Sequence, residues 1–322
     1  MNGRPFLFDP PSLFTDWMDF NLVFRRLCLA GWSDFADTSY RYTSRFLPLS
    51  FLRNRHMCSA MRYGLFYLPS SLPATRAKGA ERFRTIVEQI AYGEEIGFDS
   101  VWLAEHHFHA FAGIFSSPTV IGAAIAQRTK KMRIGTAVLL LPYHNPLRVA
   151  EDYATLDCLS NGRLELGIGH GFVKWEALTF GIPLDDLRDR FKENLDVVLK
   201  AWSEPKLNYK GRFYDYHDVQ VWPRPLQEPY PTVWMAATTS VESFELSGRY
   251  GFHMMLIPFL NEVEELRGKM QAYFSARKAA GHDPATARVL GVSCLRRRKF
   301  RRSARSCGPR TCRVQRCGER GA

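Results

Sequence analysis

The sequence predicts an α/β protein built around a parallel β-sheet, because apolar runs alternate with segments of helical periodicity. Six apolar runs between positions 61 and 258 have the composition of parallel strands that are buried on both faces. Segments between these runs place apolar residues on one helical face. Strand alternating with helix implies right-handed βαβ units, so the sheet is either open and doubly wound or closed into a barrel. Periodicity alone leaves both arrangements open.

The predicted strands begin abruptly at Met61, where the composition of the chain changes. In chain order the six runs read MRYGLFYLP, DSVWLAE, MRIGTAVLLLP, RLELGIG, TVWMAAT and FHMMLIP. A further run, ARVLGVSC, predicts one more strand just before the composition changes again at Leu295. The stretch 205–231 between two of these runs is expected to form a hairpin excursion.

Two of the intervening segments show helical spacing clearly. The first carries apolar residues at i, i+3, i+4, i+7 and i+8, and Gly97 stands where a C-terminal cap is expected. The second follows Arg188 and has the same kind of pattern. The apolar positions are Phe83, Ile86, Val87, Ile90 and Ala91 in the first segment, and Phe191, Leu195, Val198, Leu199 and Trp202 in the second.

The chain divides into three segments of different character. Residues 1–60 lack a sustained period and are expected to form an irregular N-terminal extension, and residues 61–294 form the α/β domain. Residues 295–322 form a basic tail in which apolar residues nearly vanish. This tail is expected to be disordered or an aberrant terminus, with a genuine basic tail as the alternative.

The net charge of +12 lies mainly in the tail, where eleven Lys or Arg accompany one acid, and the extension adds +2. The domain between them is neutral overall, which removes the electrostatic case for nucleic-acid binding by the domain. No stretch approaches the ~18 consecutive apolar residues of a membrane span. Seven cysteines without a C-x-x-C pair are expected to be free thiols. We therefore expect a cytoplasmic protein with no membrane partner and no specific nucleic-acid partner.

Acidic and imidazole side chains directly follow the second predicted strand, in the segment AEHHF. Glu105, His106 and His107 thus stand at the C-terminal end of a parallel strand, where barrel enzymes keep their catalytic groups. A histidine there can move a proton near neutral pH, and Glu105 could fix its tautomer. Adjacent residues of an extended chain face opposite ways, so this His pair does not form a helical zinc site. Glu105 and one of the two histidines are therefore candidates for catalysis, at least one of the histidines is expected to be structural, and no metal is expected.

The segments FDSVWLAEHHF and KKMRIGTAVLLLPYHNPLRVAEDYATLDCLSNGRLELGIGHG, in this order and spacing, resemble the bacterial-luciferase-like flavin-dependent monooxygenases. The resemblance covers roughly residues 61–290, which is most of the chain. It implies a (β/α)8 TIM barrel and so favours the barrel over the open sheet. Because the tail replaces the last one or two βα units, the barrel is expected to be incomplete at its C-terminal end.

The same resemblance implies roles for particular positions. His106 matches the first His of the family's EHH motif, which acts near the flavin. The segment 135–138 matches a strand end beneath the flavin ring, so Thr136, Ala137 and Val138 are expected to bind the cofactor. In relatives one peptide bond there is cis, and the bond between Ala137 and Val138 is the candidate.

Further cofactor contacts are expected around the flavin phosphate. One strand ends in glycines that let a ligand approach the backbone closely. Luciferases proper have a reactive Cys and then an Arg where this chain has Gly169 and His170, so the thiol is absent and His170 would replace Arg as a phosphate contact. A hydroxyl-rich turn before a predicted helix would offer hydroxyl and N–H groups to the phosphate, with plain N-capping by Ser240 as the alternative. The expected contacts are Gly169, His170, Gly171, Arg188, Thr238, Thr239, Ser240 and Ser243.

The resemblance implies a monooxygenase that uses dioxygen and reduced FMN, supplied by a separate flavin reductase, to oxidise a small organic substrate through a flavin hydroperoxide. A non-catalytic or truncated flavin-binding protein of the same fold and a deazaflavin-dependent oxidoreductase are the alternatives. The resemblance also implies a homodimer. Aromatic residues near the expected site would line the substrate pocket: Phe108, Phe111, Phe115, Tyr143 and Trp175.

Overall fold

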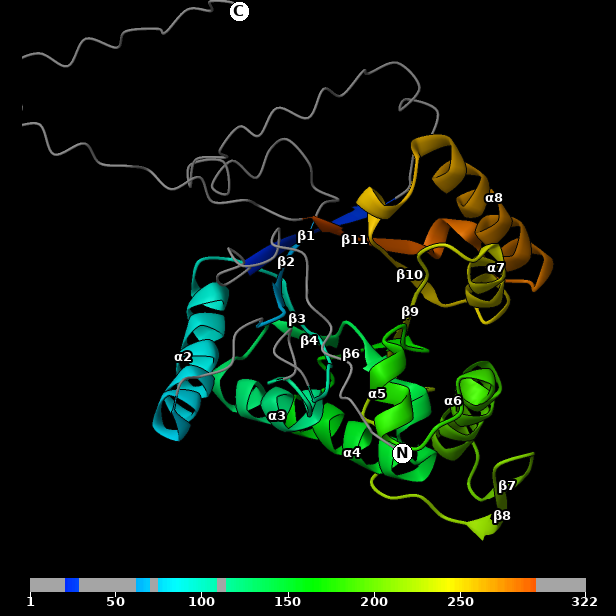
Figure 1. The fold of residues 1–322 in the computed structure, drawn as a ribbon, viewed down its shortest axis with the longest axis horizontal. Helices are drawn as coiled ribbons and strands as arrows, with labels where there is room; N and C mark the ends of the chain where they lie inside the picture. Colours follow the sequence, from blue (N-terminus) through cyan, green and yellow to red (C-terminus); the bar gives the residue numbers. More distant parts are fainter. Residues whose placement is uncertain (1–20, 29–61, 70–74, 109–113, 294–322) are drawn as a thin grey trace, which may run out of the picture.

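The computed structural model describes residues 21–28, 62–69, 75–108 and 114–293, and a curled sheet of parallel strands forms its centre (Figure 1). Parallel ladders join each of these strands to the next. β4 also pairs with β6, which links the two arms of the sheet. The parallel strands are β2 (Arg62–Tyr67), β3 (Ser100–Leu103), β4 (Arg133–Thr136), β6 (Leu164–Gly169), β9 (Thr232–Ala236), β10 (His253–Leu256) and β11 (Arg288–Ser293).

An antiparallel strand completes the ring. β1 (Asn21–Cys28) lies between β11 and β2 and pairs antiparallel with both. Its register places Val23 opposite Ser293 on one side and opposite Leu65 on the other. Among the described residues, these seven parallel strands and this one antiparallel strand form a closed ring, and the two-residue β5 (Leu139–Leu140) pairs parallel with β6 as a ninth strand of the sheet. The expectation of an incomplete TIM barrel is confirmed, because in the described residues the antiparallel β1 stands between β11 and β2, where a (β/α)8 barrel has parallel strands alone.

The expectation of irregular structure over residues 1–60 is wrong at β1. Periodicity did not reveal this strand because Arg25 and Arg26 interrupt its apolar residues, so that no alternation is sustained. The remainder of the extension and the basic tail 295–322 lie outside the described residues.

Helices follow the strands along the chain and lie outside the curled sheet (Figure 1). α2 begins after Thr75, whose hydroxyl accepts a hydrogen bond from the Lys78 amide, and Gly97 follows its C-terminus with a φ of 98°, as expected. The Asn145 side chain likewise caps α4. The helices are α2 (Arg76–Glu95), α3 (Pro118–Arg128), α4 (Pro146–Leu159), α5 (Lys174–Thr179), α6 (Leu187–Ser203), α7 (Val241–Arg249) and α8 (Val263–Ala279).

Alternate residues of the strands form two separate apolar layers. One set of side chains packs against the helices, including Val101 and Val233. The neighbouring residues form a second cluster inside the barrel, where the Trp102 and Trp234 rings meet edge to face with centroids 5.4 Å apart. Gly135 makes room for this cluster, since a Cβ there would lie 2.2 Å from Trp102 Cε3. The barrel interior is therefore a packed core, and the mouth formed by the strand ends is left for chemistry.

Shorter elements connect the main ones. The expected hairpin excursion is confirmed as an antiparallel pair outside the barrel. Its strands are β7 (Leu207–Lys210) and β8 (Asp215–Val219); β5 (Leu139–Leu140) pairs with β6, and single 3-10 turns cover Leu141–Tyr143, Leu184–Asp186, Pro258–Leu260 and Pro284–Thr286.

Candidate functional site

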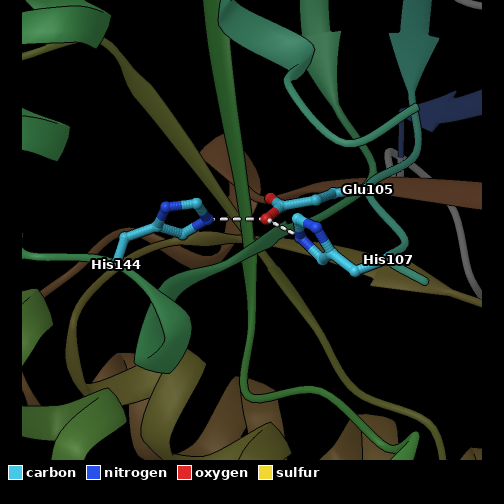
Figure 2. Close-up of side chains that lie close together, drawn as sticks. All are labelled: Glu105, His107 and His144. Atoms are coloured by element: carbon cyan, nitrogen blue, oxygen red, sulfur yellow. Dashed lines mark hydrogen bonds and ion pairs between the residues drawn. The ribbon is translucent and has the colours of Figure 1, made fainter. Parts of the chain in front are cut away.

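A buried carboxylate joins two imidazoles at the C-terminal end of β3 (Figure 2). Oε1 of Glu105 lies 2.9 Å from Nε2 of His107 and 2.6 Å from Nε2 of His144, and its Oε2 accepts a hydrogen bond from the Leu140 amide. Burial alone would raise the pKa of Glu105, but the hydrogen bonds from the two imidazoles outweigh it and hold this pKa below its ordinary value. Burial opposes a charge on His144, yet the Glu105 carboxylate raises the His144 pKa. Glu105 is thus an ionised group that fixes both rings.

The same three side chains could each offer one ligand atom to a cation, since these atoms all lie within 4.8 Å of one another. The distances from Glu105 to the two imidazoles are ordinary hydrogen-bond lengths. Glu105, His107 and His144 therefore form a hydrogen-bonded cluster.

His106 faces the other way and meets a different carboxylate. Its Nδ1 lies 3.0 Å from Oε1 of Glu176, and the same oxygen accepts a hydrogen bond from the His107 amide at 2.9 Å. Glu176 belongs to α5 and is completely buried. Glu105 therefore contacts His107 and not His106, because residues 105 and 107 share one side of the extended segment and His106 points to the opposite side.

The end of β4 has the expected backbone geometry. The peptide bond between Ala137 and Val138 is cis, and both residues are partly exposed. The Thr136 hydroxyl donates to the Gly167 carbonyl at 2.6 Å and accepts from the Gly167 amide at 2.9 Å, so this buried side chain ties β4 to β6. Gly169 lets Val138 approach, since a Cβ at Gly169 would lie 2.6 Å from Val138 Cγ2. Ala137 and Val138 are the members of this group that face the surface.

A basic pocket lies between α6 and α7 at the same end of the barrel, and we call it the anion pocket. It brings together His170, Arg188 and Ser243, three of the residues expected at the phosphate. Lys192 and Arg249 add positive charge that sequence reasoning missed. The other lining residues are Phe191, Met235, Glu242 and Leu246.

The remaining expected phosphate contacts lie beside the anion pocket without lining it. Thr238 and Thr239 belong to the turn before α7. Ser240 occupies the N-cap position, but its side chain makes no capping hydrogen bond, and its carbonyl accepts from the Ser243 amide at 3.1 Å. Gly171 has a φ of 79° and sits against the Tyr143 hydroxyl, which a Cβ at Gly171 would approach to 2.6 Å.

Aromatic side chains surround the histidines. The Phe180 ring meets His107 edge to face at 4.8 Å and lies 4.9 Å from the Phe108 ring. Phe108 and Trp175 are exposed, as substrate-lining residues would be. Phe115 is different: it is completely buried and stacks on Phe83, so its assignment to the substrate pocket is corrected to a role in the core. Phe111 lies outside the described residues.

The chain belongs to the luciferase-like monooxygenase family, whose model matches residues 61–297. The alkanal monooxygenase alpha chain of Photorhabdus laumondii is 29% identical over 223 residues, or 69% of this chain and 61% of that protein. An F420-dependent glucose-6-phosphate dehydrogenase of Amycolatopsis mediterranei is 34% identical over 185 residues, or 53% of each chain. The solved structure of a monooxygenase from Streptomyces bottropensis superimposes with a TM-score of 0.66 at 32% identity, covering 69% of this chain and 67% of that one.

These comparisons identify the expected fold and family. The Amycolatopsis relative is F420-dependent, and the oxygenating constituent of a 3,6-diketocamphane monooxygenase from Pseudomonas putida, which has the same fold, was solved in complex with FMN. Curated relatives extend beyond the matched region, since the chain covers only 60% and 51% of two of them. No helix in the described part of the chain combines the length and apolar character needed to cross a membrane.

Proposed function

We propose that this protein is a monooxygenase that uses reduced FMN and dioxygen to oxidise a small organic substrate. One observation carries the proposal: the His106–Glu176 pair and the anion pocket lie at the same mouth of a luciferase-like barrel. A separate flavin reductase would supply the reduced cofactor. A homodimer belongs to the proposal through the family resemblance.

The residues of the mouth fit a phosphorylated flavin. Arg188, Lys192 and Arg249 provide three positive charges against the single Glu242 carboxylate, which suits a phosphate that carries nearly two negative charges at neutral pH. The exposed edge at Ala137 and Val138 would contact the ring system. These two groups of residues would orient the cofactor between them.

His106 would accept and donate a proton during the oxidation. The Glu176 carboxylate would accept a hydrogen bond from Nδ1–H, which makes Nε2 the accepting nitrogen of the neutral imidazole and stabilises the imidazolium once it forms. The Phe172 ring meets the His106 ring edge to face with centroids 6.0 Å apart and would limit the access of water to this histidine. When bound, a reduced flavin would supply the two electrons that the oxidation by dioxygen requires, with one oxygen atom entering the substrate and the other leaving as water.

A second candidate function is a deazaflavin-dependent oxidoreductase, which would transfer a hydride and consume no oxygen. The similarity to the Amycolatopsis dehydrogenase favours this candidate. A non-catalytic flavin-binding protein is the third candidate, since in the described residues an antiparallel strand, β1, closes the ring between β11 and β2.

Anaerobic titration of the full chain with reduced FMN, followed by admission of oxygen, separates these functions. The proposal predicts saturable binding of reduced FMN. After oxygen is admitted, it predicts a long-lived absorbance band of oxygenated flavin before the spectrum of oxidised FMN appears. Binding without that absorbance would favour the non-catalytic protein, and binding of reduced F420 in place of FMN would favour the oxidoreductase.

The His106→Ala variant tests the proton-transfer role. This change should uncouple flavin oxidation from product formation and release hydrogen peroxide, because the site would lose the imidazole that transfers the proton during the oxidation. The ratio of product to flavin oxidised is the measurement. An unchanged ratio would remove His106 from the mechanism.

A further inference from the structure

An acidic side chain occupies the anion pocket beside its basic groups. Oε2 of Glu242 lies 2.5 Å from Nη1 of Arg188, and both residues line the pocket. Glu242 is the second residue of α7, where the partial positive charge of the helix N-terminus also attracts an anion. The Arg188 guanidinium and the N-terminus of α7 thus attract the Glu242 carboxylate in the same way as they would attract a phosphate group.

This ion pair joins two different helices and is open to solvent. Arg188 comes from the first turn of α6, and the two side chains are 59% and 53% exposed. An exposed ion pair of this kind contributes little to the stability of the fold. The stabilising effect of the pair therefore does not account for an acidic residue in a pocket whose other charged residues are basic. Its position does have a consequence for a ligand, because a second anion must either displace Glu242 from Arg188 or bind next to its charge.

We propose that Glu242 is an internal competitor for the anion pocket, which weakens the binding of the cofactor phosphate and keeps the cofactor exchangeable. This inference rests on the proposed flavin-binding function. Arg188 is paired with Glu242, and an arriving phosphate takes over its guanidinium while Lys192 and Arg249 supply the remaining charge. Glu242 therefore determines how strongly the pocket distinguishes a phosphorylated flavin from an unphosphorylated one.

The first test compares Glu242→Gln with the unaltered full chain, using FMN and riboflavin as probes. Glutamine keeps the size of the side chain and removes its charge. The dissociation constant for FMN should fall about two- to fivefold, in the range set by exposed charge pairs, while that for riboflavin should stay the same. Equal FMN affinities in the two proteins, or equal tightening of FMN and riboflavin, would overturn the proposal.

The matched control is Glu88→Gln. Glu88 is also an exposed acid paired with an arginine of another helix, with its Oε2 2.7 Å from Nη2 of Arg128, but it lies on α2 and does not line the pocket. This variant loses the same charge and should bind FMN like the unaltered protein. FMN tightening equal to that of Glu242→Gln would overturn the inference by showing an effect of net charge.

Inorganic phosphate gives a test that does not depend on flavin binding. Phosphate should raise the thermal unfolding temperature of Glu242→Gln more than that of the unaltered protein, because a ligand stabilises the folded state according to its affinity. Equal shifts would contradict the role of Glu242. If neither protein binds any flavin, the proposed function fails, and the phosphate measurement still decides the inference.

Discussion

Nδ1 of His106 and Oε1 of Glu176 lie 3.0 Å apart, although 70 residues separate them in the chain. The same carboxylate oxygen holds the backbone of His107, so it fixes both the ring of His106 and the path of the chain beside it. Glu176 is a positioning residue in this arrangement, since it would act on the reaction through His106.

The Glu176→Gln variant is expected to lower the rate of coupled oxidation by about 10²-fold, in the range found for general acid–base catalysis. Glutamine can still accept both hydrogen bonds through its carbonyl oxygen, but it no longer stabilises an imidazolium. The measurement is product formed per flavin oxidised, together with the pH profile of the rate. A purely structural role for Glu176 would lower stability and leave the pH profile unchanged.

The Glu105–His144 pair should make stability depend on pH in two directions. The raised pKa of His144 adds stability that is complete below the ordinary value of 6.5 and is lost as the pH rises through the folded-state value. The lowered pKa of Glu105 adds stability that is present above the ordinary value of 4.5 and is lost as the pH falls through the folded-state value. The contribution of the pair is therefore greatest between these two ordinary values.

Urea unfolding across this pH range, compared between the unaltered protein and Glu105→Gln, measures that contribution. The variant should lose about 1 to 3 kcal/mol near pH 6, because two imidazoles lose their charged acceptor. Its stability should also vary less with pH. Parallel pH curves for the two proteins would show that Glu105 is not the source of the dependence.

The Gly135→Ala variant should be destabilised by about 1 to 3 kcal/mol, the usual range for overpacking. Its new methyl group would lie 2.2 Å from Trp102 Cε3 inside a packed barrel. Gly268→Ala is the control: Gly268 lies within α8, and an added methyl group there would meet nothing within 4 Å, so alanine should stabilise that helix by about 0.5 to 1 kcal/mol. Denaturant midpoints of the two variants should move in opposite directions, and a loss equal for both would contradict the packing argument.

Substituting proline within β1 tests whether this strand completes the barrel wall. The Phe24→Pro variant should weaken the ladders that join β1 to β2 and β11, because proline cannot donate a ladder hydrogen bond and is excluded from central strands. Amide hydrogen exchange should then accelerate in β2 and β11 and change little in β6. Unaltered exchange in both neighbours would show that β1 is dispensable for the wall.

Most of the barrel could be predicted from sequence, because its strands are buried on both faces and its helices carry one apolar face. The cis bond between Ala137 and Val138 and three residues of the anion pocket followed from the family resemblance. Glu176 could not be found in this way, since it lies in a helix of six residues and meets His106 only in the folded chain. Lys192 follows Arg188 by one helical turn, and that spacing was a usable signal on α6.

β1 escapes prediction for a different reason. Its pairing depends on the gap between β2 and β11, and local composition carries no information about such a gap. The contact between Glu105 and His107 has a local cause instead, because the alternation of an extended segment places residues 105 and 107 on the same side. The position of β1 thus depends on long-range contacts, whereas the choice of His107 over His106 follows from a rule that the sequence alone could have supplied.

The position of β1 has a consequence for the order of events in folding. Arg26 pairs with Arg62 after a short stretch of chain, whereas Val23 pairs with Ser293, 270 residues later. During synthesis from the N-terminus, β1 and β2 emerge early and must keep one edge unpaired until β11 has been made. Closure of the ring is thus the slowest kind of contact to form, and until β11 has been made one edge of β1 stays without its partner strand.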